Sequence, residues 1–85
     1  MDMENRSVSD EVLDFLTSSP TPEAIVAFKP SPAAQERLRY LLDANRSGIL
    51  TPDERGELDE FELVDFFLSR LKTRARKKLA ERADG

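Results

Sequence analysis

The feature that most constrains this chain is a long C-terminal stretch with an unbroken helical pattern. It opens at Thr51-Pro52, and after Gly56 no glycine or proline interrupts it before the final Gly85. Its apolar residues step by three or four positions, which is close to a heptad seam. They are Leu58, Phe61, Val64, Leu68, Leu71, Ala75 and Leu79. The pattern predicts one helix that is by far the longest element of the 85-residue chain.

A second pattern marks where the helices begin. A serine or threonine precedes a proline at Thr21-Pro22, Ser31-Pro32 and Thr51-Pro52. The hydroxyl caps the helix, and proline fits the first helical position because its missing N–H has no helical partner there. At the third start, Glu54 completes a capping box. We therefore predict helices over about 10–17, 22–28 and 32–44, and from 52 onwards, with frayed ends at about 1–6 and 81–85.

These elements predict an all-α fold in which three short helices pack on one long C-terminal helix. The chain is long enough for a single small helical domain over residues 1–85. Two short helices carry stripes that we expect to face the core. They are Val8, Val12, Leu13 and Leu16 in the first, and Ala34, Leu38, Leu41 and Leu42 in the third. Gly48 is expected to reverse the chain after the third helix.

The composition argues against catalysis. The chain has no cysteine and no histidine, which removes thiol nucleophiles, disulfides, the usual zinc and haem ligands and every Ser-His pair. No glycine-rich phosphate loop is present. We expect no enzymatic activity and no cofactor. The N-terminus lacks the apolar core of a signal peptide, and no apolar run approaches the length of a membrane span. We therefore expect a cytoplasmic protein that does not enter a membrane.

Between residues 61 and 71 the long helix is apolar most of the way round, since seven of these eleven residues are large and apolar. A surface helix needs only one apolar stripe. The segment is therefore either buried by the three short helices or offered to another chain. We assign this segment to a protein partner. The candidate partner-binding residues are Phe61, Leu63, Val64, Phe66, Phe67, Leu68 and Leu71.

Charge is divided along the same helix. Residues 51–65 hold seven acids against Arg55, and residues 70–82 hold seven bases against Glu81. This division complements the helix dipole, and it would also let two such helices pair antiparallel in a homodimer. Six of the seven bases are candidates for contact with an acidic partner or a nucleic-acid backbone. They are Arg70, Lys72, Arg74, Arg76, Lys77 and Lys78. The net charge of −4 weighs against a dedicated nucleic-acid binder.

Residues 43–54 resemble an EF-hand calcium loop. Oxygen donors stand at loop positions 1, 3, 5, 9 and 12, and Gly48 stands at position 6, where the loop turns sharply. The candidate ligands are Asp43, Asn45, Ser47, Thr51 and Glu54. A second interpretation explains the same residues as the end of one helix and the capping box of the next. A calcium-binding helix-loop-helix module is therefore an alternative to partner binding.

Several short sequence segments together resemble those of a known group of proteins. They lie at residues 15–23, 27–28, 35–38, 41–48, 50–52 and 57–59. They are similar to those of small bacterial helical proteins of cyanobacterial type, and the likeness covers about residues 10–76. Members of that group are treated as antitoxin-like partners of a nuclease encoded beside them. The resemblance implies a non-enzymatic module that binds, and inhibits, a nuclease-type toxin from an adjacent gene. A helical homodimer with weak nucleic-acid contact through the basic tail is a further alternative.

Overall fold

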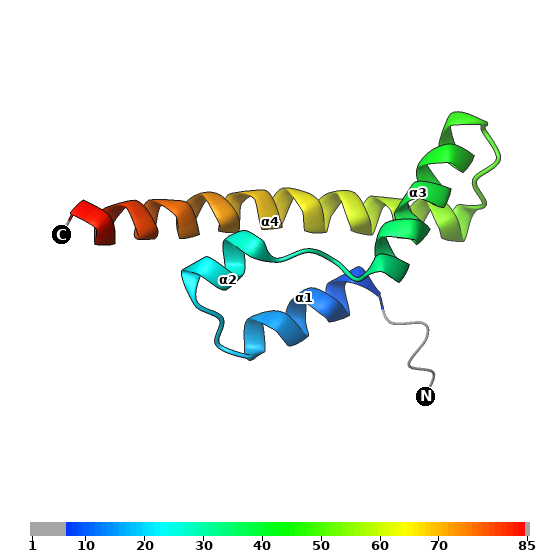
Figure 1. The fold of residues 1–85 in the computed structure, drawn as a ribbon. Coiled ribbons are helices and arrows are strands. Elements are labelled where there is room, and N and C mark those ends of the chain that lie inside the picture. Colours follow the sequence, from blue (N-terminus) through cyan, green and yellow to red (C-terminus); the bar gives the residue numbers. More distant parts are fainter. Residues whose placement is uncertain (1–6, 85) are drawn as a thin grey trace.

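The computed structural model describes residues 7–84 and contains four α-helices joined by short loops (Figure 1). They are α1 (Val8–Thr17), α2 (Pro22–Ala27), α3 (Pro32–Arg46) and α4 (Pro52–Asp84). No strand occurs among the described residues, so the predicted all-α fold is confirmed. The first helix begins two residues earlier than predicted, α2 ends one residue earlier and α3 ends two residues later. The last helix continues to Asp84, where we expected fraying, whereas residues 1–6 lie outside the described part.

All three predicted hydroxyl caps are present. Thr21, Ser31 and Thr51 each accept the backbone N–H three residues further on, at 3.1 Å. Glu54 returns the bond by accepting the Thr51 N–H at 3.0 Å, which completes the capping box. A fourth hydroxyl cap, and a second capping box, at Ser7 explains the early start of α1. These bonds satisfy N–H groups that the helices themselves leave unpaired.

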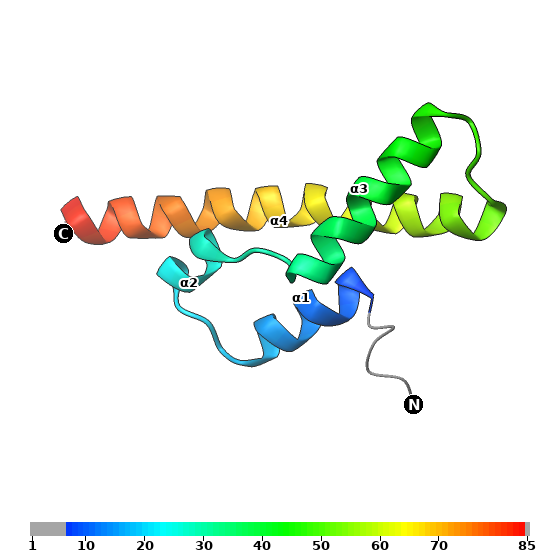
Figure 2. The same cartoon turned by 45° about the vertical axis from the view of Figure 1, so that its right-hand side comes forward.

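The helices α1 and α2 lie on one side of α4, which runs the length of the molecule, and α3 crosses the N-terminal part of α4 (Figures 1 and 2). A helix of 33 residues is about 50 Å long, and the largest dimension of the protein is 52 Å. The short helices pack mainly on α4 rather than on one another. The second helix runs antiparallel to the C-terminal half of α4, because Glu23 near its start contacts Arg82 and Phe28 at its end contacts Lys72.

The core lies where α1 and α3 meet the N-terminal half of α4. It consists of Val8, Ala34, Leu41, Leu58 and Phe61. The side chains of Leu41 and Leu58 are fully enclosed. The predicted seam of α4 is the inward face, as expected. Its members Leu58, Phe61, Leu68 and Ala75 are buried, and Val64, Leu71 and Leu79 are half-buried.

Two predicted core residues are on the surface instead. Leu13 in α1 is 59% exposed and Leu42 in α3 is 42% exposed. Each short helix packs mainly on α4, which buries a narrower stripe than a helix in a larger core would bury. In α3 the buried position beyond Leu41 is Ala44, three residues further along the stripe.

Gly48 closes α3 as predicted. Its φ of +72° is the left-handed conformation that glycine adopts without steric cost. The Gly48 N–H donates to the Asn45 carbonyl at 3.1 Å, and the Ile49 N–H donates to the Ala44 carbonyl at 3.0 Å. This pair of bonds is the Schellman motif. It turns the chain so that α4 can pass back beneath α3.

Candidate protein-interaction surface

The side of α4 that faces away from the short helices carries a stripe of exposed side chains. Since an α-helix has 3.6 residues per turn, positions spaced by three and four residues share one face. We define the outer face as seven residues, all exposed. They are Asp59, Glu62, Leu63, Phe66, Phe67, Arg70 and Arg74. Read along the helix, the outer face is acidic, then apolar, then basic.

Three large apolar side chains form the centre of the outer face. Leu63 is 69% exposed, Phe66 is 62% exposed and Phe67 is 49% exposed. Single exposed apolar residues are common on protein surfaces, but these three are neighbours at i, i+3 and i+4. A contiguous exposed apolar patch of this kind marks a binding surface or an aggregation liability.

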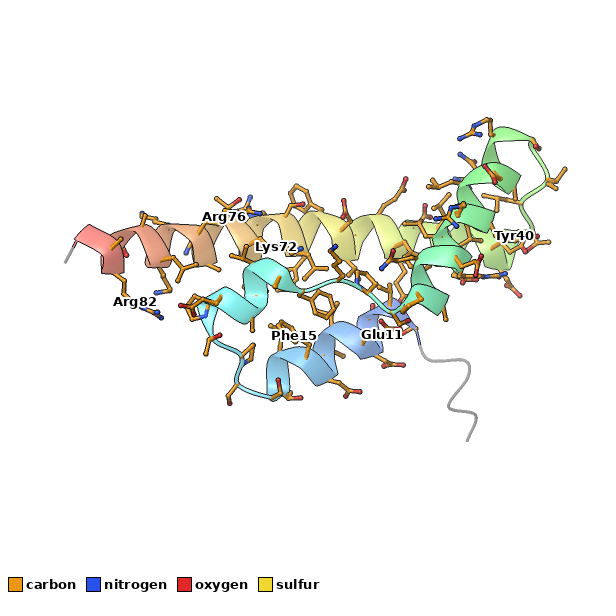
Figure 3. All side chains as sticks on the ribbon, viewed as in Figure 1. Glu11, Phe15, Tyr40, Lys72, Arg76 and Arg82 are labelled. Carbon is orange, nitrogen blue, oxygen red and sulfur yellow. The ribbon has the colours of Figure 1, made fainter. Side chains whose placement is uncertain are left out.

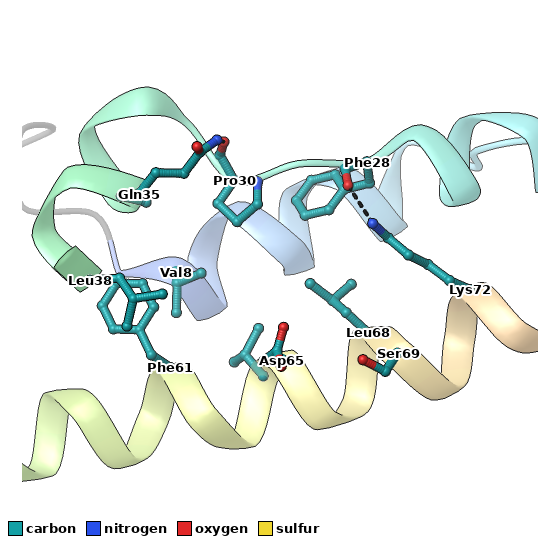
Figure 4. A pocket seen from close by; sticks show the side chains of 12 residues that line it. Val8, Phe28, Pro30, Gln35, Leu38, Phe61, Asp65, Leu68, Ser69 and Lys72 are labelled. Carbon is teal, nitrogen blue, oxygen red and sulfur yellow. Dashed lines mark hydrogen bonds between the residues drawn. The ribbon is translucent and has the colours of Figure 1, made fainter. Parts of the chain in front are cut away.

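The structure divides the seven predicted partner-binding residues between two sides of α4. Phe61 and Leu68 are buried by the short helices, and Val64 and Leu71 are half-buried. Phe61, Val64 and Leu68 line a small cavity of about 140 Å³ beneath the linker from α2 to α3 (Figure 4). Phe61 and Leu68 serve intramolecular packing, and Leu63, Phe66 and Phe67 are the members of the set that are most exposed to another chain.

The charged residues that flank the apolar centre form no ion pair within the described part of the chain. The guanidinium carbon of Arg70 lies 5.8 Å from the centroid of the Phe66 ring, within range of a cation–π contact. No ion pair found among the described residues involves Asp59, Glu62, Arg70 or Arg74. Both the acidic and the basic end of the outer face are therefore free to meet charges on another chain.

The predicted basic contacts also separate into two groups. The Nζ of Lys72 donates to the Phe28 carbonyl at 2.7 Å and so covers the end of α2. Figure 3 shows Lys72 and Arg82 on the side of α4 that faces α2. The other predicted residues are exposed. They are Arg70, Arg74, Arg76, Lys77 and Lys78. Contact with nucleic acid through them stays a prediction.

Side chains on α3 that the sequence did not single out hold this helix to α4. Arg37 forms a two-pronged ion pair with Glu57, with Nε–Oε2 at 2.8 Å and Nη2–Oε1 at 2.9 Å. This pair lowers the pKa of Glu57. The Tyr40 hydroxyl donates to Glu54 at 3.1 Å, which raises the pKa of Tyr40. Contacts of this kind depend on how two helices cross, so sequence spacing gives no sign of them.

The candidate calcium ligands are engaged with protein groups. Asp43 pairs with Arg46 at 3.3 Å, and the Asn45 side-chain oxygen accepts from Arg55. Ser47 is the C-cap of α3. Thr51 and Glu54 cap one another. Among the described residues, no group of three acidic, histidine or cysteine side chains is arranged to hold a metal ion. The guanidinium of Arg55 adds positive charge to a ligand position, which opposes cation binding.

No protein-family model, curated protein or solved structure matches this chain. Within residues 7–84, no helix combines the length and the apolar character needed to cross a bilayer.

Proposed function

We propose that this protein is a non-enzymatic interaction module that binds a protein partner through the outer face of α4. The observation that carries the proposal is the exposure of Leu63, Phe66 and Phe67 side by side on the longest helix. A helix presented in this way is suited to lie along a groove or along another helix, with its apolar residues as anchors. The flanking charges would set orientation and steer the encounter.

The absence of buried polar side chains among the described residues favours binding over catalysis. Active sites shift pKa values by burying titratable groups in clefts. Here the shifted acids, such as Glu54 and Glu57, are explained by caps and ion pairs that hold helices together. The whole chain also lacks histidine and cysteine.

The resemblance to antitoxin-like proteins makes a nuclease-type toxin from a neighbouring gene the first heterologous partner to test. Under this proposal the toxin would contact the outer face, and the exposed bases beyond Arg70 would add electrostatic contacts. Inhibition would then follow from the toxin's surface being covered.

Co-expression with the product of the neighbouring gene, followed by purification through a tag on that product, tests the proposal. We expect co-purification of the wild-type chain and its loss in Phe66→Glu/Phe67→Glu. A matched control, Leu13→Glu/Leu42→Glu, places two acids on exposed apolar positions of α1 and α3. It should leave the complex intact. Circular dichroism must show equal helicity in all variants. A complex that survives the α4 substitutions would remove the outer face as the binding surface.

A further inference from the structure

We propose that the partner that fits the outer face of α4 is a second copy of this chain, bound antiparallel about a two-fold axis near Phe66. The inference rests on the proposed function, since it names the occupant of that same surface. Three observations carry it: the order of charges along the outer face, the exposure of its apolar centre, and the absence of ion pairs to its charged residues within residues 7–84.

The charge order is self-complementary only in the antiparallel arrangement. Glu62 lies four residues before Phe66, and Arg70 lies four residues after it. An axis at Phe66 therefore brings Glu62 of each copy opposite Arg70 of the other, twice in the dimer. One turn further out, Asp59 lies seven residues before Phe66 and Arg74 lies eight residues after it, so these two charges also come near one another, one residue out of exact register. Such an interface is isologous, because the same residues serve both copies.

A parallel pairing has the opposite electrostatics. It would place Glu62 opposite Glu62 and Arg70 opposite Arg70, and like charges in contact disfavour association. The apolar centre does not distinguish the two arrangements, since Phe66 meets an aromatic ring in either. The charges on its two sides therefore select the antiparallel dimer.

The buried area predicts a reversible dimer. An aromatic side chain offers about 150–250 Å² for burial. At the observed exposures of Leu63, Phe66 and Phe67, the apolar centre contributes roughly 300–400 Å² per copy. A stable interface buries about 800 Å² per partner, so the charged flanks must lie inside the contact as its rim. We expect a dimer that dissociates on dilution through the micromolar range.

The decisive experiment is a charge exchange followed by sedimentation velocity, over micromolar to submillimolar concentrations of the full chain. In Glu62→Arg alone or Arg70→Glu alone, both ion pairs of the dimer become like-charge contacts. We expect each substitution to raise the dimer dissociation constant by about ten- to a hundredfold. The double variant Glu62→Arg/Arg70→Glu restores complementarity and should dimerise as the wild type does. An equimolar mixture of the two single variants should form a heterodimer.

The control for charge reversal is Arg39→Glu, at an exposed position on α3. This substitution should leave the dimer dissociation constant unchanged.

The outcomes separate this inference from the proposed function. Recovery in the double variant and in the mixture supports the antiparallel dimer, because no heterologous partner would produce both. The inference is overturned if the charge substitutions leave the dimer dissociation constant unchanged. It is also overturned if Phe66→Glu still forms the dimer. A wild-type chain that stays monomeric at the highest concentration overturns it too. In that last case the outer face still stands as a binding surface if Phe66→Glu/Phe67→Glu abolishes co-purification with the neighbouring gene product.

Discussion

The carboxylate of Glu11 accepts two hydrogen bonds from Ser31, one from its backbone N–H at 2.8 Å and one from its hydroxyl at 2.7 Å. The same hydroxyl accepts the Ala34 N–H at 3.1 Å and so caps α3. Glu11 thereby fastens α1 to the N-terminal end of α3, where the helix dipole also favours a negative charge. Figure 3 shows Glu11 on α1 close to the start of α3.

Replacing Glu11 should therefore destabilise the fold. We expect Glu11→Ala to lower the free energy of unfolding by about 1.5–3 kcal/mol, since both lost hydrogen bonds involve a charged acceptor. Urea titration followed by circular dichroism measures the change. Glu36→Ala, at an exposed position on α3, should change stability by no more than about 0.5 kcal/mol. Because both residues share the same bonds, Glu11→Ala combined with Ser31→Ala should cost less than the sum of the single effects.

Gly48, in the loop before α4, and Gly56, inside α4, should respond to alanine in opposite directions. A Cβ at either position meets no atom within 4 Å, so backbone conformation alone decides the sign. Gly48→Ala should destabilise by about 1–2 kcal/mol because of its positive φ. Gly56→Ala should stabilise by about 0.5–1 kcal/mol, since Gly56 lies inside a helix. Thermal unfolding of the two variants tests this, and a shift of the same sign in both would contradict it.

The two contacts that tie α2 to α4 should differ in strength. The bond from Lys72 to the Phe28 carbonyl is partly buried, so Lys72→Met should weaken the fold by about 1 kcal/mol. It should also increase amide hydrogen exchange in α2 more than elsewhere. The pair between Arg82 and Glu23 is exposed on both sides. We expect no measurable loss of stability in Arg82→Met, because exposed ion pairs contribute little. Equal effects from the two substitutions would argue against this ranking.

Acid should weaken the contact between α3 and α4. Arg37 holds the pKa of Glu57 below its ordinary value of 4.5. The stabilisation is therefore complete above pH 4.5 and is lost as the pH falls through the lower, folded-state value. The pKa of Glu54 is also lowered, mainly by the hydrogen bond from the Thr51 N–H. Protonation of Glu54 in acid therefore lowers the stability as well. We expect the unfolding free energy to be nearly constant at pH 5–7 and to fall below pH 4.5.

Variants at this ion pair provide the check. Glu57→Gln should lower stability at neutral pH by about 0.5–1 kcal/mol, as expected for a partly exposed two-pronged pair. It should also flatten the decline in acid. Arg37→Gln removes the same interaction from the other side and should flatten the decline similarly. An unchanged acid profile in both variants would show that this pair is not responsible.

The starts of α2, α3 and α4 were predictable because capping is local chemistry, whereas the start of α1 was placed two residues too late. Thr51 and Glu54 are three residues apart, and their reciprocal bonds need no other part of the chain. The inward seam of α4 was predictable for a similar reason, since its spacing follows helix geometry alone. The exposure of Leu13 and Leu42 was not, because it depends on how many neighbours each short helix touches.

The candidate surface was predicted only in outline. The sequence located the apolar segment at residues 61–71, but it did not show that Phe61 is buried and Phe66 is exposed. That separation requires knowing which side of α4 the short helices occupy. The roles of Lys72, Glu11 and Arg37 also depend on segments distant in sequence, and these come together only in the folded chain.

The dependence of all three short helices on α4 has a consequence for how the chain folds during synthesis. The residues that enclose Val8 and Leu41 include Leu58 and Phe61, which the ribosome adds later. Until α4 has emerged from the ribosome, α1, α2 and α3 have their apolar stripes exposed and little to pack against. The nascent chain is therefore most vulnerable to proteases and to chaperone capture before α4 emerges, and it gains its structure late and cooperatively.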